Sequence, residues 1–154
     1  MALTHEFYLI PAIEDAEHLW RNIANHPKVV DSVVIHDDII LYINDTMKWI
    51  PSRNPALPGA PTGAGINYYG VTLFNQHSAA ALYRIFSAWR DLFLNSPQVL
   101  ELTGEFYTVE GEAQSGQYER LIYERDEVIE QFAKMISFAE KLAEGRFYLY
   151  HCGI

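Results

Sequence analysis

A long amphipathic segment between Asp126 and Gly145 constrains the fold of this chain more than any other feature. Its apolar residues recur every three or four positions, as on one side of an α-helix. They are Val128, Phe132, Met135, Ile136, Ala139, Leu142 and Ala143. Asp126 is suited to cap the start of the helix, and Gly145 is suited to end it. The sequence therefore predicts a helix here that packs one face against another layer.

Two further stretches have helical spacing. One lies between residues 13 and 24 and ends at His26-Pro27. The other follows Asn75 or Ser78, either of which can cap it. Its apolar set is Leu82, Ile85, Phe86, Trp89 and Phe93.

Strand-like segments alternate with these helices. They span residues 6–10, 32–36, 39–44, 67–74, 99–109, 117–124 and 147–152. Asp37-Asp38 is read as the turn of a hairpin between the second and third segments. Gly104 predicts a bulge inside the 99–109 strand. In the last strand, Phe147, Leu149 and His151 are expected on one face, opposite Tyr148, Tyr150 and Cys152.

The resulting order is β-α-β-β, a long loop, and β-α-β-β-α-β. This order predicts an α+β fold in which a largely antiparallel sheet packs against three helices. The C-terminal part has the order of a ferredoxin-like unit. We expect a single domain over residues 1–154, made of a half at 1–50, a Pro/Gly loop at 51–66 and a half at 67–154.

Composition and charge narrow the class of protein. Twenty acidic residues against eleven basic ones give 11 − 20 = −9. This balance argues against nucleic acid or an anionic membrane as the main partner, because both favour a basic surface. The single cysteine, the lack of a basic leader and the lack of a long apolar run favour a cytoplasmic protein without a membrane span.

The loop "RNPALPGAPTGAGINYYG" (53–70) is rich in proline and glycine. Its glycines run into a strand rather than a helix, and Arg53 is its only basic residue, so it does not match a phosphate-binding loop. It is either a connector or a lid that binds a partner. Trp49, Tyr68 and Tyr69 at its ends either form an aromatic mouth or pack in the core.

An acidic stretch is the second candidate site. No lysine or arginine occurs from Asp91 to Glu119, whereas glutamates recur at Glu101, Glu105, Glu110 and Glu112. These four could form a negative surface that attracts a basic protein. Surface charge is ordinary, so a solvated sheet face with acidic turns is the more common explanation. Two of them could instead be an acid/base pair if burial raised the pKa of one. A bulge at Gly104 could put Glu101 and Glu105 on opposite faces.

Cofactor and nucleophile motifs are absent from the sequence. No pair of histidines has helical metal spacing, no Cys-rich zinc motif occurs, and no G-x-S-x-G is present. No cofactor, metal site or catalytic residue is therefore assigned. His5 and His151 lie on the first and last strands, and they would meet if these strands pair.

Four motifs, INDTMKW, NYYGVTLF, ELTGEFY and the terminal YHCGI, resemble a group of small bacterial proteins of unknown function. Some of these carry the label "coagulation factor 5/8 type". The resemblance covers most of the chain and implies a bacterial, cytoplasmic protein, but it implies no activity and no site residue. The label itself implies a β-sandwich, which the three predicted helices do not fit.

Three functions fit these observations. The preferred hypothesis is a non-enzymatic binding module for a basic protein partner, such as an immunity protein or a regulator. The first alternative is a small-molecule enzyme of glyoxalase-like type, because the β-α-β-β order occurs twice and His5 stands at the start of the first strand. The second is a scaffold subunit that oligomerises through an exposed strand or aromatic patch, and a homodimer is compatible with it.

Overall fold

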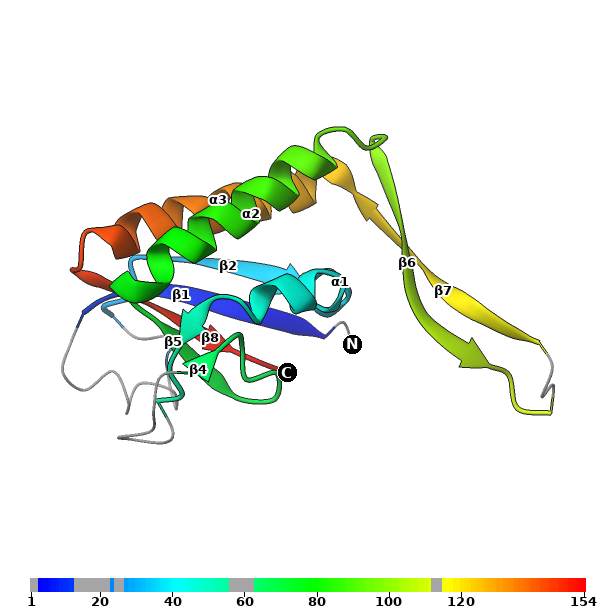
Figure 1. Ribbon diagram of the computed structural model, residues 1–154, viewed down its shortest axis with the longest axis horizontal. Coiled ribbons are helices and arrows are strands. Elements are labelled where there is room, and N and C mark those ends of the chain that lie inside the picture. Colours follow the sequence, from blue (N-terminus) through cyan, green and yellow to red (C-terminus); the bar gives the residue numbers. More distant parts are fainter. Residues whose placement is uncertain (1–2, 13–22, 24–26, 56–62, 112–114) are drawn as a thin grey trace.

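A four-stranded antiparallel sheet lies at the centre of the fold, in a computed structural model that describes residues 3–12, 23, 27–55, 63–111 and 115–154. Across the sheet the strands are β2 (Asp31–His36), β1 (Thr4–Pro11), β8 (Phe147–Cys152) and β5 (Val71–Phe74) (Figure 1). The first and last strands of the chain therefore pair in the middle of the sheet. The helix expected between residues 13 and 24 lies outside the described residues, apart from Ile23.

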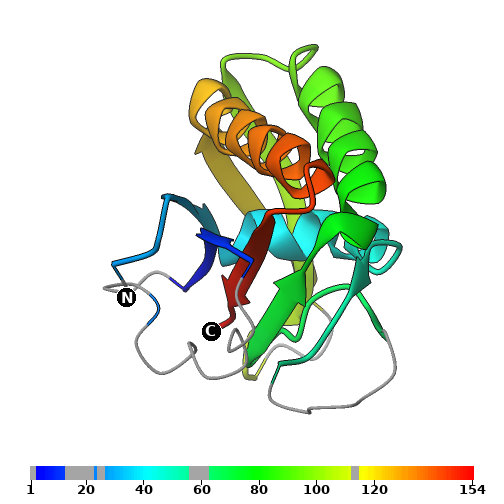
Figure 2. The ribbon, with the colours of Figure 1, turned by 90° about the vertical axis from the view of Figure 1, so that its left-hand side faces the viewer.

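Two long helices lie side by side over one face of this sheet (Figure 2). They are α2 (Ala79–Phe93) and α3 (Arg125–Ala143), and both were predicted from their apolar stripes. Phe132 of α3 is fully buried and meets Phe86 and Phe93 of α2, with ring centroids 5.2 and 5.7 Å apart. A short 3₁₀ helix, Gln76–Ser78, leads into α2.

Strand β8 divides its side chains between two apolar clusters, as its alternation predicts. Leu149 belongs to the main core under the helices, and Phe147 packs against that core. Tyr150 belongs to a smaller cluster with Tyr8, and Tyr148 packs against it. The predicted two-faced arrangement of the last strand is confirmed.

The segment after β2 is helix α1 (Asp37–Met47). The prediction that residues 39–44 form the second strand of a hairpin, after a turn at Asp37-Asp38, is therefore wrong. The apolar side chains face the core at helical spacing, which a strand would not allow. The buried ones are Ile39, Ile40, Ile43 and Met47. The Nδ1 atom of His36 accepts the N–H of Asp38 at 3.1 Å and so caps the helix.

The ends of the predicted Pro/Gly loop pair with each other. They form β3 (Pro51–Ser52) and β4 (Gly63–Ala64), a two-residue antiparallel pair. Residues 56–62, the middle of the loop, lie outside the described residues, so its role as a connector or a lid stays a prediction.

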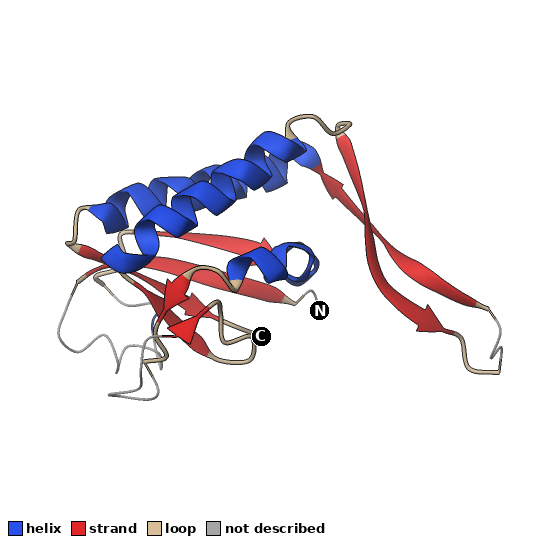
Figure 3. Cartoon of the chain, in the orientation of Figure 1, coloured by secondary structure: helices blue, strands red, loops and turns tan. Residues whose placement is uncertain are grey.

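A long hairpin projects from the end of the two helices, away from the central sheet (Figures 1 and 3). It consists of β6 (Val99–Thr108) and β7 (Gly116–Glu124), which pair only with each other among the described strands. We call it the β6–β7 arm. Its register shifts between Thr103 and Phe106, which confirms the bulge predicted at Gly104. Because β6 and β7 form a sheet of their own, the ferredoxin-like arrangement is not confirmed.

The fold is α+β with mostly antiparallel sheets, as predicted. The described part has three α-helices, of which α2 and α3 were predicted and α1 was not. None of the helices in the described ranges is long and apolar enough to cross a membrane.

Candidate functional site

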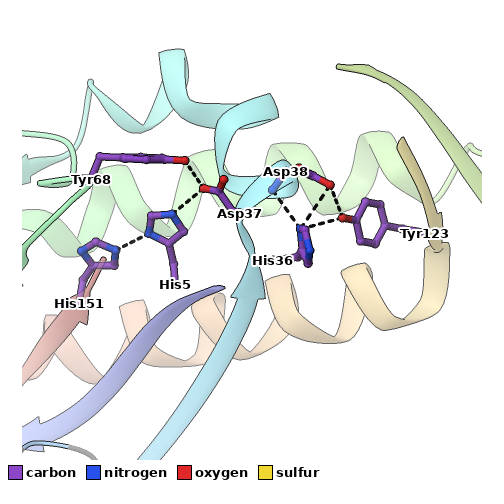
Figure 4. A network of polar contacts seen from close by, with 7 residues as sticks. All are labelled: His5, His36, Asp37, Asp38, Tyr68, Tyr123 and His151. Carbon is purple, nitrogen blue, oxygen red and sulfur yellow. Dashed lines mark hydrogen bonds and ion pairs between the residues drawn. The ribbon is translucent and has the colours of Figure 1, made fainter. Parts of the chain in front are cut away.

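A continuous chain of hydrogen-bonded side chains crosses one end of the central sheet (Figure 4). The Nδ1 atom of His5 lies 2.8 Å from Nε2 of His151, and its Nε2 atom lies 2.9 Å from Oδ1 of Asp37. The hydroxyl of Tyr68 donates to the same carboxylate oxygen. The Oγ1 atom of Thr72 lies 3.3 Å from Nδ1 of His151. The two histidines do meet, because β1 pairs with β8.

One arrangement of protons satisfies the whole chain. With Asp37 as a carboxylate, His5 must donate its Nε2–H, so its Nδ1 atom is free to accept from Nε2–H of His151. The Nδ1 atom of His151 then accepts from the hydroxyl of Thr72, whose oxygen accepts the backbone N–H of Asn67 at 2.7 Å. Both imidazoles are neutral in this arrangement.

Burial keeps these imidazoles neutral. It lowers the pKa of His151 to about 3, and the neighbouring His5 lowers it further in the same direction. Burial also lowers the pKa of His5, outweighing the hydrogen bond and charge of Asp37, which act to raise it. The pKa of Tyr68 is raised, first by burial and then by its hydrogen bond to Asp37.

A histidine held by an aspartate is an arrangement that general bases use. Here, however, both imidazole rings are fully buried, so a substrate does not reach them in this structure. Within the described ranges, no group of three or more His, Cys, Asp or Glu side chains is placed to hold a metal ion. These hydrogen bonds fasten β1, β8 and β5 to the start of α1.

A second polar cluster joins the root of the β6–β7 arm to α1 (Figure 4). The hydroxyl of Tyr123 on β7 lies 2.6 Å from Oδ2 of Asp38 and 2.7 Å from Nδ1 of His36. Burial raises the pKa of this tyrosine, followed by its hydrogen bond to Asp38 and the charges of Asp38 and Glu119. Tyr123 therefore ties the root of the arm to the start of α1.

A cleft of about 310 Å³ opens between α1 and the arm, just beyond Tyr123. Its lining residues are Asp38, Leu41, Tyr42, Thr103, Gly104, Glu105, Glu119 and Leu121. We call it the arm cleft. It combines three carboxylates with apolar and aromatic walls. Neither Glu105 nor Glu119 forms an ion pair with any residue in the described part of the chain.

The predicted acidic residues are divided between the two sides of the arm. Glu105 lies in the arm cleft, whereas Glu101 lies on the opposite side and pairs with Arg120. The bulge at Gly104 causes this separation, as the sequence allowed. Glu110 is exposed near the tip, and Glu112 lies outside the described residues.

The predicted aromatic and basic residues near the Pro/Gly loop do not form one site. Trp49 and Tyr69 are 69% and 80% exposed, so neither packs in the core. Tyr68 and Tyr69 touch edge to face with centroids 4.8 Å apart, and no ring contact joins either to Trp49 among the described residues. The backbone of Arg53 pairs with that of Leu73, and its side chain is exposed.

The sequence did not identify Asp37 and Asp38 as members of the two polar clusters, because it assigned both to a turn. It also did not identify Tyr42 as part of the arm cleft, because it assigned this residue to a strand. The signal that could have found them is the helical spacing of Ile39, Ile43 and Met47 behind two acidic residues, which is typical of a first helical turn.

Comparisons with known proteins give no further guide to the site. No protein-family model, curated protein or solved structure matches the chain.

Proposed function

We propose that this protein is a non-enzymatic binding module that holds a basic protein partner in the arm cleft. The observation that carries the proposal is the convergence of Asp38, Glu105 and Glu119 on one open cleft beside a projecting hairpin. An immunity protein or a regulator is the kind of module we have in mind.

The cleft has the features that a lysine or arginine side chain requires. Carboxylates supply acceptors for the charged end, and the half-exposed ring of Tyr42 can lie against a cation. Leu41 and Leu121 offer apolar surface to the aliphatic part of the same side chain. Because Glu105 and Glu119 are not paired with described residues, a cation from a partner would relieve their mutual repulsion.

The surrounding charge supports the same reading. Residues 99–111 and 115–124, which are the arm and the described part of its turn, contain five glutamates and one arginine, which gives 1 − 5 = −4. The whole chain carries −9. Such a field would speed the approach of a basic protein, and the effect would weaken as salt is added.

The test uses a short arginine-rich peptide and a matched peptide in which citrulline replaces each arginine. We expect only the arginine peptide to shift the amide signals of Thr103 and Gly104 in NMR spectra. The variant Glu105→Gln/Glu119→Gln should bind it roughly 5–30-fold more weakly, from about 0.5–1 kcal/mol for each partly exposed pair.

The matched control is Glu130→Gln/Glu140→Gln, which removes the same charge from exposed sites on α3. It should bind almost as the unchanged protein does. Equal binding of the citrulline peptide, or equal losses in both double variants, would show that the cleft is not the binding site. A pull-down from native lysate with the same variants then identifies the partner.

A further inference from the structure

The two faces of the β6–β7 arm differ in exposure near its root. Near the root, the large side chains on the face toward the body are buried or pack against the main core. They are Leu100, Leu102, Leu121 and Tyr123, whereas Tyr107, nearer the tip of this face, is 45% exposed. On the opposite face, which we call the outer face, large side chains are about half exposed. They are Val99 (44%), Phe106 (56%), Tyr118 (65%) and Ile122 (54%).

The aromatic end of the outer face is a fixed arrangement. Phe106 and Tyr118 are cross-strand partners, and their rings meet edge to face with centroids 5.2 Å apart. The ring of Phe106 also lies over Gly116, since a Cβ there would lie 1.8 Å from its Cζ atom. A glycine covered by a neighbouring aromatic ring is a feature that stabilises strand pairing. The two rings therefore form one continuous exposed aromatic surface over Gly116.

The outer face carries two acids and one base, 1 − 2 = −1, whereas the arm cleft holds three carboxylates and no base. Alternation along β7 places Tyr118, Arg120 and Ile122 on this face. Its charged side chains are Arg120 and Glu101, which form an ion pair, and Glu124, which is exposed at the root of the arm opposite Val99. The outer face would attract a basic partner less strongly than the arm cleft does, so a different partner is expected on this face.

We propose that the outer face is the interface with a second copy of this chain, related by a two-fold axis. A two-stranded ribbon is marginal on its own and gains stability when another layer covers it. In a two-fold interface the same patch meets itself, so Glu101 of each copy can reach Arg120 of the other. The part of the face around Glu101 and Arg120 is self-complementary in this way.

The area is adequate for such a dimer. The four large side chains expose on the order of 400 Å² per copy. The flanking polar side chains and the strand backbone extend this toward the roughly 800 Å² per partner of a stable interface. The arm cleft lies on the opposite face of the arm, so the dimer leaves both copies of it open. This inference does not depend on the proposed function.

The first test measures the mass of the protein by sedimentation velocity over a wide range of concentration. We expect a dimer whose dissociation constant rises at least about tenfold in Tyr118→Thr. The control is Tyr69→Thr, because Tyr69 is a more exposed tyrosine away from the arm. It should leave the dimer intact. A protein that stays monomeric at every concentration, or a dimer that Tyr118→Thr does not weaken, overturns the proposal.

The second test exchanges charges between copies. Glu101→Arg alone and Arg120→Glu alone should each weaken the dimer, because each puts like charges together. A mixture of the two variants should form the mixed dimer at least about tenfold more strongly than either variant pairs with itself. If Glu101 and Arg120 pair only within one chain, mixing the two variants will not restore the dimer. That result would contradict the two-fold arrangement even if the protein were dimeric.

Discussion

The buried histidine chain predicts a specific loss of stability in mild acid, which the substitution His151→Gln should reduce. His151 is fully buried and its pKa falls to about 3 in the folded protein, against 6.5 for an unburied imidazole. Below pH 6.5 the unfolded chain therefore binds a proton that the folded protein does not. Stability is fully present above pH 6.5 and is lost as the pH falls toward the folded pKa.

The size of the loss follows from these two values. Between pH 7 and pH 5, protonation of His151 in the unfolded chain alone removes about 2 kcal/mol from the free energy of unfolding. His5 adds a loss of the same sign, because its pKa is also lowered by burial. Most carboxylates titrate below this range, so the histidines dominate it.

Glutamine is the informative replacement because its amide nitrogen can take the place of the Nε2 atom that donates to His5. Urea unfolding at pH 7 and pH 5 gives the free energies directly. We expect the drop between the two pH values to be about 2 kcal/mol smaller in His151→Gln than in the unchanged protein. His77→Gln, which alters an exposed imidazole, should keep the full drop.

The refuting result is an equal drop in His151→Gln and the unchanged protein. It would mean that His151 is protonated in the folded state, and the proton arrangement described above would fail. An NMR titration of the ring protons gives an independent check, since the signal of His151 should not move between pH 7 and pH 5.

Three further substitutions test the packing and the arm. Phe132→Ala should lower the free energy of unfolding by about 3–5 kcal/mol in urea, because it empties the fully buried contact between α2 and α3. Tyr123→Phe should cost about 1 kcal/mol and speed amide hydrogen exchange in the arm, because it removes the hydrogen bond to Asp38 that anchors the root. Gly153→Ala should cost about 1–3 kcal/mol in thermal melts, because its Cβ would lie 2.1 Å from the backbone oxygen of Tyr68. An unchanged melting curve for the last variant would show that the turn at Tyr68 yields easily.

The sequence predicted the elements that carry a strong periodic signal. The stripes of α2 and α3 and the alternation of β8 depend on spacing along one segment, and all three were placed within a few residues. The prediction for residues 39–44 was wrong because "IILYIN" contains β-branched residues, which favour a strand. Packing of these side chains against the core stabilises the helix instead. Tertiary contacts therefore outweighed the local strand preference of this segment.

The candidate site was harder to predict, because its parts come from distant segments. Glu105 was identified as a candidate, but its neighbours in the arm cleft include Asp38 on α1. The two residues are close only because of the direction in which the arm leaves the body, which the sequence does not show. Tyr123 links the arm to the body through its contacts with Asp38 and His36, which also lie far from it in the sequence. The strands of the arm were predicted nearly to the residue, but nothing in their alternation shows that they stand apart from the central sheet.

The junction between the arm and α3 fixes the direction of the arm relative to the helix, which affects the entropy cost of binding to it. Strand β7 ends at Glu124 and α3 begins at Arg125, with no loop between them. The backbone N–H of Arg125 bonds to Gln98, and its guanidinium reaches the carbonyl of Ser96, so both strands are tied to the same helix end. A hairpin fixed in this way is preorganised, and a molecule that docks on it pays little conformational entropy. If the proposed partner binds the arm cleft, its binding energy contributes to affinity and is not used to order the arm.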